Sequence, residues 1–185
     1  MQNNFVGNFI FIIFAHMEWE KEANQILRQR AIECGLCNQW QEEWGSDWSA
    51  EKLVERFFAG IDFYAQTRFF DKNKVKDLFG TEFLRKHNVL IDDKWSLLSP
   101  KRAALIGQSA TTLRYGMRNV SEAYLFDNSS ALITCKTNAT AIIHLYDNAS
   151  AVAKAYDAGR VLVIRHGVNT RARVEGNASV EDEMD

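Results

Sequence analysis

A ten-residue repeat in the C-terminal half constrains the fold more than any other feature of this sequence. Asn128, Asn138 and Asn148 lie ten residues apart, and each precedes two small or hydroxyl-bearing residues. Six-residue segments separate these positions, and small or aliphatic residues occupy every second place in them, at Ala131/Ile133/Cys135, Ala141/Ile143/Leu145, Ala151/Ala153/Ala155 and Val161/Val163. Because strand side chains alternate with a period of two, an even repeat keeps the same face inside in every copy. The repeat therefore predicts stacked strands around a narrow interior.

Two folds satisfy this pattern: a β-solenoid with two ten-residue units per coil, and an antiparallel β-meander. We favour the solenoid, because a meander needs another layer to cover its apolar face and no helical pattern follows residue 96. Residues 96–180 would form about four coils, roughly 20 Å of stack at the usual strand spacing. The expected corners of the coils are Asn119, Asn128, Asn138, Asn148 and Asn177. Asparagine tolerates the left-handed backbone of a sharp corner, and stacked amides can hydrogen-bond along a ladder.

Helical patterns precede the repeat. An amphipathic segment runs from Glu18 to about Cys37, where Gly35 stops it. Ser49 is positioned to cap a helix over residues 50–66, and Asp71 to cap another over residues 72–79. The predicted fold class is α+β, with a helical head (17–95) that caps one end of the solenoid (96–180). An acidic tail (181–185) is expected to keep the other end soluble.

Residues 1–16 are interpreted as a leader. Their apolar run at 9–15 is too short to span a bilayer, and it lacks the basic start of a secretory signal. We expect either that translation starts at Met17 or that the leader is a docked strand or a frayed tail.

Composition and cysteine content indicate a folded cytoplasmic protein. A hydrophobic content of 46%, a charged content of 25% and a net charge of −2 argue against disorder and against a wholesale nucleic-acid binder. Three cysteines make no disulfide framework, which favours a reducing compartment. Cys34 and Cys37 form a Cys-x-x-Cys pair without two further ligands, so we interpret them as packing residues. Trp40, Trp44 and Trp48 are likewise interpreted as packing residues.

No catalytic motif is present, and we predict a non-enzymatic protein with no cofactor, no metal and no membrane span. The out-facing aromatic and cationic residues of the repeat are the candidate binding residues: Lys136, His144, Tyr146, Lys154, Tyr156 and His166. Ladders of such groups on a flat β wall present binding surfaces in repeat proteins. The alternative is an ordinary solvated face built from residues that favour strands.

Several short motifs carry a resemblance. These are the turn Gly35-Leu36-Cys37, the passages Lys-His-Asn-Val (86–89) and Ile-Asp-Asp (91–93), and the aromatic-Asp-Asn-Ala-Ser repeats. Together they resemble a group of small uncharacterised proteins of anaerobic gut bacteria, their prophages and other mobile elements. The resemblance implies a role in phage biology or defence, as an adaptor or inhibitor that binds an unknown protein. A small-molecule or polyanion ligand (a nucleotide, nucleic acid or glycan) is the second hypothesis, and oligomers could form by solenoid stacking.

Overall fold

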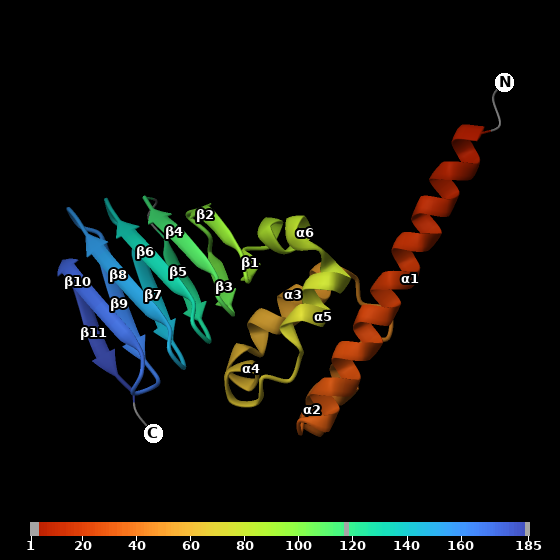
Figure 1. The fold of residues 1–185 in the computed structure, drawn as a ribbon, viewed down its shortest axis with the longest axis horizontal. Helices are drawn as coiled ribbons and strands as arrows, with labels where there is room; N and C mark the ends of the chain where they lie inside the picture. Colours follow the sequence, from red (N-terminus) through yellow and green to blue (C-terminus); the bar gives the residue numbers. More distant parts are fainter. Residues whose placement is uncertain (1–3, 117–118, 184–185) are drawn as a thin grey trace. The chain divides into compact units, whose positions relative to one another are not determined.

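A computed structural model describes residues 4–116 and 119–183 and divides the chain into two compact units, Met1–Phe79 and Gly80–Asp185 (Figure 1). The first unit is helical. The second begins with a short helix and continues as a parallel β-solenoid of about four turns. The predicted fold class is therefore confirmed, and the antiparallel meander is not needed.

The helical unit contains α1 (Asn4–Glu33), α2 (Asn38–Glu43), α3 (Ala50–Ala59), α4 (Ile61–Thr67) and α5 (Lys72–Phe79). Residues 4–16 form the start of α1 rather than a docked strand or a frayed tail, and the start of translation at Met17 stays a prediction. Extending a helix costs much less than nucleating one, so the strong helix-forming segment after Met17 can carry its helix into this run. Residues 1–3 lie outside the described part.

The predicted stop at Gly35 and the predicted cap at Ser49 are confirmed. Gly35 adopts a φ of +91°, and the amides of Gly35 and Leu36 donate to the carbonyls of Ile32 and Ala31, at 2.9 Å each. This double hydrogen bond is the Schellman arrangement that glycine allows. The Ser49 side chain accepts a hydrogen bond from the Lys52 amide at 3.3 Å, as an N-cap should.

One detail of the helical head differs from the prediction. The expected helix over 50–66 is broken at Gly60, which ends α3 by donating to Arg56 O at 2.9 Å. The tryptophans pack within this unit: Trp44 stacks on Trp48 with 5.2 Å between ring centres, and the Arg56 guanidinium lies 4.5 Å from the Trp40 ring. Both contacts fit the packing role expected of them.

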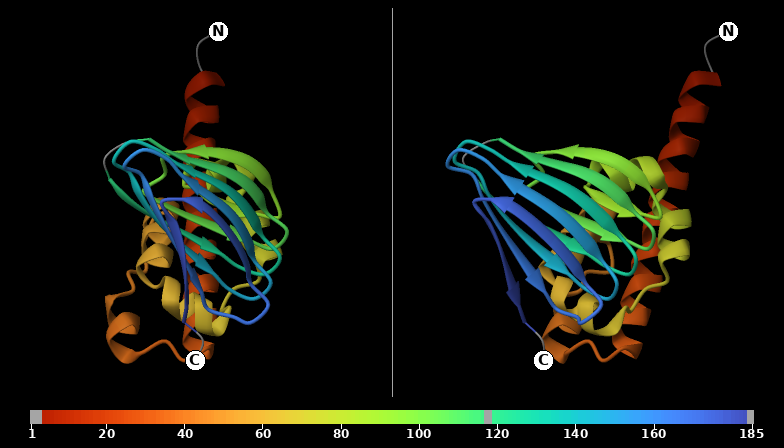
Figure 2. Two further views of the ribbon diagram at one scale, coloured as in Figure 1. Left: turned by 90° about the vertical axis from the view of Figure 1, so that its left-hand side faces the viewer. Right: turned by 60° about the vertical axis from the view of Figure 1, so that its left-hand side comes forward.

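The second unit starts with α6 (Thr81–Lys86), which is followed by eleven strands. One sheet, sheet A, contains β1 (Val89–Ile91), β3 (Arg102–Ile106), β5 (Val120–Leu125), β7 (Thr140–Leu145), β9 (Arg160–Arg165) and β11 (Ala178–Asp182). The other, sheet B, contains β2 (Lys94–Leu98), β4 (Ala110–Tyr115), β6 (Ser130–Cys135), β8 (Ser150–Ala155) and β10 (Arg171–Gly176). The two sheets are the walls of a flattened coil (Figure 2).

The register explains the repeat. Ser130 pairs with Ser150 in sheet B, and Thr140 pairs with Arg160 in sheet A, so each coil in the middle of the solenoid takes twenty residues and two repeats. The spacing changes in the last coil, where Arg171 pairs with Ser150 and Ala178 with Val161. The first coil is irregular: Val89 pairs with Ala104 and Lys94 with Ala110, fifteen and sixteen residues apart. The ten-residue period is therefore absent from this coil. The predicted solenoid, 96–180, is based on that period and so starts later than the first strand, Val89–Ile91. At the other end β11 takes in part of the predicted acidic tail.

The interior is as predicted. The alternate residues of β6 to β9 named above are all buried, and most of them have no exposed surface. Burial raises the pKa of the Cys135 thiol, which keeps it protonated within the stack.

The corners at Asn128, Asn138 and Asn148 lie where predicted, but the left-handed residue is the one before the asparagine. Positive φ values belong to Asp127, Thr137 and Asp147, and also to Asp157, which precedes Ala158. Each of these residues comes directly after the residue whose carbonyl accepts the hydrogen bond of the turn. At Thr137, for example, the Ala139 N–H donates to Lys136 O at 3.2 Å. Short polar side chains tolerate this backbone almost as asparagine does. The expected amide ladder is present at one corner, where the Asn148 side chain donates to Asn128 Oδ1 at 3.3 Å.

Candidate binding surface

The six predicted binding residues fall on two separate surfaces. Successive strands alternate between the sheets, so successive corners lie on opposite edges of the coil. Lys136 and Tyr156 follow strands of sheet B, and Lys154 lies within it. His144 lies in sheet A, and Tyr146 and His166 follow its strands. The structure therefore divides the expected single wall into two groups of three residues.

The sheet A group belongs to a stack of rings that we call the aromatic ladder: Tyr124, Phe126, His144, Tyr146 and His166. Its ring centres are 4.8 Å apart between Phe126 and Tyr146 and 4.4 Å apart between Tyr146 and His166. Tyr124 stacks on His144 at 4.7 Å, and a hydrogen bond of 3.0 Å joins His144 Nδ1 to His166 Nε2. These rings cover one another's faces, so the ladder ties neighbouring coils together and offers little ring surface to a ligand.

The sheet B group lies at a different surface, the sheet B face, which is formed by the outward side chains of its five strands. Lys154 belongs to this face, and Lys136 and Tyr156 lie at its edge. From β2 to β10 these are Lys94, Ser96, Leu98, Ala110, Thr112, Arg114, Ser130, Leu132, Thr134, Ser150, Val152, Lys154, Arg171, Arg173 and Glu175. The five strands contain five basic residues and one acidic residue, a net charge of +4. The six strands of sheet A contain three basic and three acidic residues, a net charge of zero. Only one wall of the solenoid is cationic.

The sheet B face also has apolar residues in the open. Leu132, in the middle strand, is 45% exposed, and Leu98 is 81% exposed. A cation lies beside Leu98 in its row, since Arg114 pairs with Leu98 on one side and with Thr134 on the other. Exposed apolar groups inside a charged rim are typical of surfaces that bind other proteins.

An open hollow of about 700 Å³ lies at the edge of the sheet B face. It is lined by Leu98, Ser99, Arg114, Tyr115, Gly116, Thr134 and Lys136. The Lys136 ammonium lies 5.7 Å from the centre of the Tyr156 ring, so two of the predicted residues meet at this edge. Tyr115 is buried, its hydroxyl has no hydrogen-bond partner, and desolvation raises the pKa of this phenol well above its ordinary value.

Lys154, the third predicted residue on this side, is paired. Its ammonium lies 2.9 Å from Glu175 Oε2. The hydrogen bond between them raises the pKa of Lys154 and lowers the pKa of Glu175.

Sequence reasoning missed Arg114, Leu98 and Leu132. Leu98 and Arg114 precede the first regular ten-residue repeat. Leu132 lies within a repeat, but the repeat pattern identifies the buried positions and not the outward ones. Alignment at twenty residues would place Arg114 beside Thr134 and Lys154, because these three share one row of sheet B.

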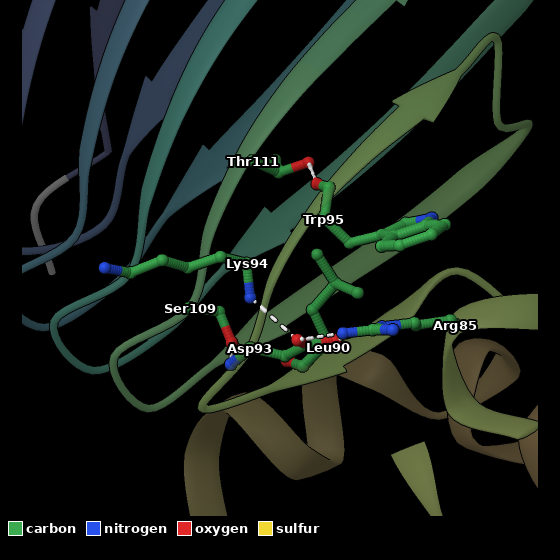
Figure 3. Close-up of polar contacts among 7 residues, drawn as sticks. All are labelled: Arg85, Leu90, Asp93, Lys94, Trp95, Ser109 and Thr111. Atoms are coloured by element: carbon green, nitrogen blue, oxygen red, sulfur yellow. Dashed lines mark hydrogen bonds and ion pairs between the residues drawn. The ribbon is translucent and has the colours of Figure 1, made fainter. Parts of the chain in front are cut away.

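At the N-terminal end of the coil α6 contacts β1, and Figure 3 shows the Arg85 side chain of α6 reaching Asp93. Arg85 forms two hydrogen bonds of 2.7 Å with the Asp93 carboxylate, and its guanidinium lies 4.3 Å from the Trp95 ring. The Ser109 hydroxyl lies 3.0 Å from Leu90 O and 3.2 Å from the Asp93 amide, and the Thr111 hydroxyl donates to Trp95 O. The hydrogen bond to Asp93 raises the pKa of Arg85. This network anchors α6 to the first coil, and we interpret it as structural.

Across 4–116 and 119–183, no group of three or more His, Cys, Asp or Glu residues could hold a metal ion. No helix in the described part of the chain is long and apolar enough to cross a membrane.

Comparison with protein-family models, with curated proteins and with solved structures finds no match for this chain.

Proposed function

We propose that this is a non-enzymatic binding protein whose sheet B face binds an acidic protein partner. The observation that carries the proposal is the charge difference between the two walls, +4 on sheet B and zero on sheet A. A flat wall of one sign attracts an oppositely charged partner over several ångströms and orients its approach.

The apolar side chains favour a protein over a plain polyanion. Leu98 and Leu132 would bury surface only against apolar groups, which an acidic protein surface can supply and a phosphate backbone cannot. Five strands of about six residues make a face of roughly 20 Å by 20 Å. That is about half the area of a standard interface on each partner, so we expect a weak, salt-sensitive complex.

The hollow favours a second candidate function. Arg114, Thr134 and Lys136 bring two cations and a hydroxyl to a hollow of about 700 Å³, large enough for a nucleotide or a short glycan. In this case the ligand would be a small anion held at the edge of the sheet, with the Tyr156 ring beside Lys136.

The resemblance stated above supports an accessory adaptor or inhibitor carried by a phage or another mobile element. The three cysteines are free thiols, which supports placing the protein in the cytoplasm.

Two matched charge reversals test the proposal. Arg114 and Arg160 are both exposed arginines in strands, one on each sheet. The probe is a labelled peptide of alternating Glu and Leu, and oligothymidylate serves as a polyanion without apolar side chains. We expect Arg114→Glu to weaken peptide binding about tenfold, or ~1.4 kcal/mol, and Arg160→Glu to change it little. Equal losses in both variants would overturn the proposal, and tighter binding of oligothymidylate than of the peptide would favour a polyanion ligand instead.

A further inference from the structure

The C-terminal end of the solenoid differs from the end that α6 contacts. Within residues 4–116 and 119–183, β10 and β11 are the last strands of their sheets, and no strand pairs with their outer edges. Ala172, Val174 and Ala178 are only partly buried there, and Val180 is 37% exposed. Folded proteins normally cover or pair an edge of this kind, because it invites association.

The directions of the backbone groups define which residues could pair. Arg171 N–H donates to Ala149 O at 3.0 Å and Asn177 N–H to Ala155 O at 3.2 Å, so odd-numbered residues of β10 point toward β8. Glu183 N–H donates to Arg165 O at 2.9 Å, so odd-numbered residues of β11 point toward β9. Amide and carbonyl groups of successive strand residues point in opposite directions. The even-numbered residues of both strands therefore present their backbone groups at the free edges.

We propose that these edges bind a second copy of this chain, with β10 of each copy antiparallel to β11 of the other. A two-fold axis parallel to the strands produces both ladders at once, since neighbouring walls of a coil run in opposite directions. The chain also rises about half a strand spacing, roughly 2.4 Å, from one wall to the next. When β10 pairs with β11 in both ladders, the two ladders have the same strand separation despite this offset. When β10 pairs with β10 and β11 with β11, one pair is too far apart to bond if the other is at bonding distance.

The side chains match in this arrangement. The register that places Val174 opposite Val180, both facing inward, places Arg173 opposite Glu181 and Arg171 opposite Glu183 on the outside. The start of β10 carries the arginines and the end of β11 the acidic residues, so every outward pair of opposite residues is free of like charges. Within one chain these groups have partners of their own: Arg173 lies 3.3 Å from Glu175, and His166 Nδ1 lies 3.6 Å from Glu183. Pairing with a second copy adds to these contacts.

Charge reversal at one pair tests the dimer. Arg173→Glu and Glu181→Arg should each raise the dimer dissociation constant at least about tenfold, or ~1.4 kcal/mol, because each variant creates two like-charged pairs. The double variant R173E/E181R restores opposite charges and should dimerise like the original chain. The measurement is sedimentation equilibrium of the full chain, with native mass spectrometry for stoichiometry and circular dichroism to confirm that each variant is folded.

Three results would overturn the proposal: a monomer at every concentration, single variants that dimerise unchanged, or a folded double variant that stays monomeric. Like-strand pairing predicts the second of these, because its Arg173 residues would already face each other. None of these readouts depends on an acidic partner, so the dimer and the proposed function can fail separately.

Discussion

The two walls of the solenoid are built from the same repeat, yet their outer surfaces differ in kind. On sheet A, rings in one outer row stack across neighbouring coils, as Tyr124 does on His144. On sheet B, the same kind of row carries Arg114, Thr134 and Lys154. The inner positions of both walls must be small and apolar for the coils to stack, so they leave no freedom. The residues of the outer rows do not pack in the core and can therefore vary. The difference between the two walls shows that binding residues can occupy these rows without destabilising the fold.

The largest expected effect tests the division between inside and outside within one strand. Ile133 is fully buried, while its neighbour Leu132 is 45% exposed on the sheet B face. Ile133→Ala should lower the free energy of unfolding by about 2–5 kcal/mol, because a cavity remains in a narrow core. Leu132→Ala should change it by less than about 0.5 kcal/mol. Urea unfolding of both variants checks this, and equal losses would break the assignment of faces.

The next effect sharpens the comparison between the walls. Tyr146→Ala removes two ring stacks of the aromatic ladder and should lower the free energy of unfolding by about 2 kcal/mol, while peptide binding stays unchanged. Tyr156→Ala should do the reverse, weakening peptide binding with little loss of stability, since Tyr156 is 45% exposed. Thermal unfolding and peptide titration are measured on both. A loss of binding in the Tyr146 variant alone would move the site to sheet A.

A smaller effect concerns the hollow. The buried Tyr115 hydroxyl has no hydrogen-bond partner, so Tyr115→Phe should stabilise the fold by about 1 kcal/mol. Because burial raises the pKa of Tyr115, the unfolded chain loses this proton first as pH rises. The original chain should therefore lose stability above about pH 10, the ordinary pKa of tyrosine, and the phenylalanine variant should lose less. Urea unfolding at neutral and alkaline pH measures both, and a destabilised variant would show that the hydroxyl does have a partner.

The smallest expected effect is a change in stability at acidic pH. The hydrogen bond to Lys154 holds the pKa of Glu175 below its ordinary value of 4.5, so the unfolded chain takes up this proton first as pH falls. The contribution of this pair is therefore complete above that value and is lost below it. Glu175→Gln should slightly reduce the fall in the free energy of unfolding as pH drops below this value, which urea unfolding at several acidic pH values measures. An unchanged pH profile would mean that solvent screens the pair fully.

The sequence predicted the solenoid because its interior imposes a period, and Ile133, Ile143 and Leu145 repeat with it. It predicted the site less well, because a ten-residue repeat mixes two walls. His144 and Lys154 occupy equivalent places in the repeat, yet they lie on opposite sheets, since a coil contains two repeats. The left-handed corner residues were displaced by one position because several short polar residues tolerate that backbone. Arg114 shares a row with Thr134 and Lys154 at a spacing of twenty residues, which a ten-residue alignment does not bring together.

The measurement that tests the central claim most directly is site-specific photo-crosslinking in the native host. A benzophenone side chain is placed at Leu132 on sheet B or at Leu162 on sheet A, the two being outward positions in strands of the two walls. Our account predicts a discrete crosslinked protein from position 132 only, lost when Arg114→Glu is added. A crosslink from position 162 that survives Arg114→Glu, with none from position 132, would contradict it.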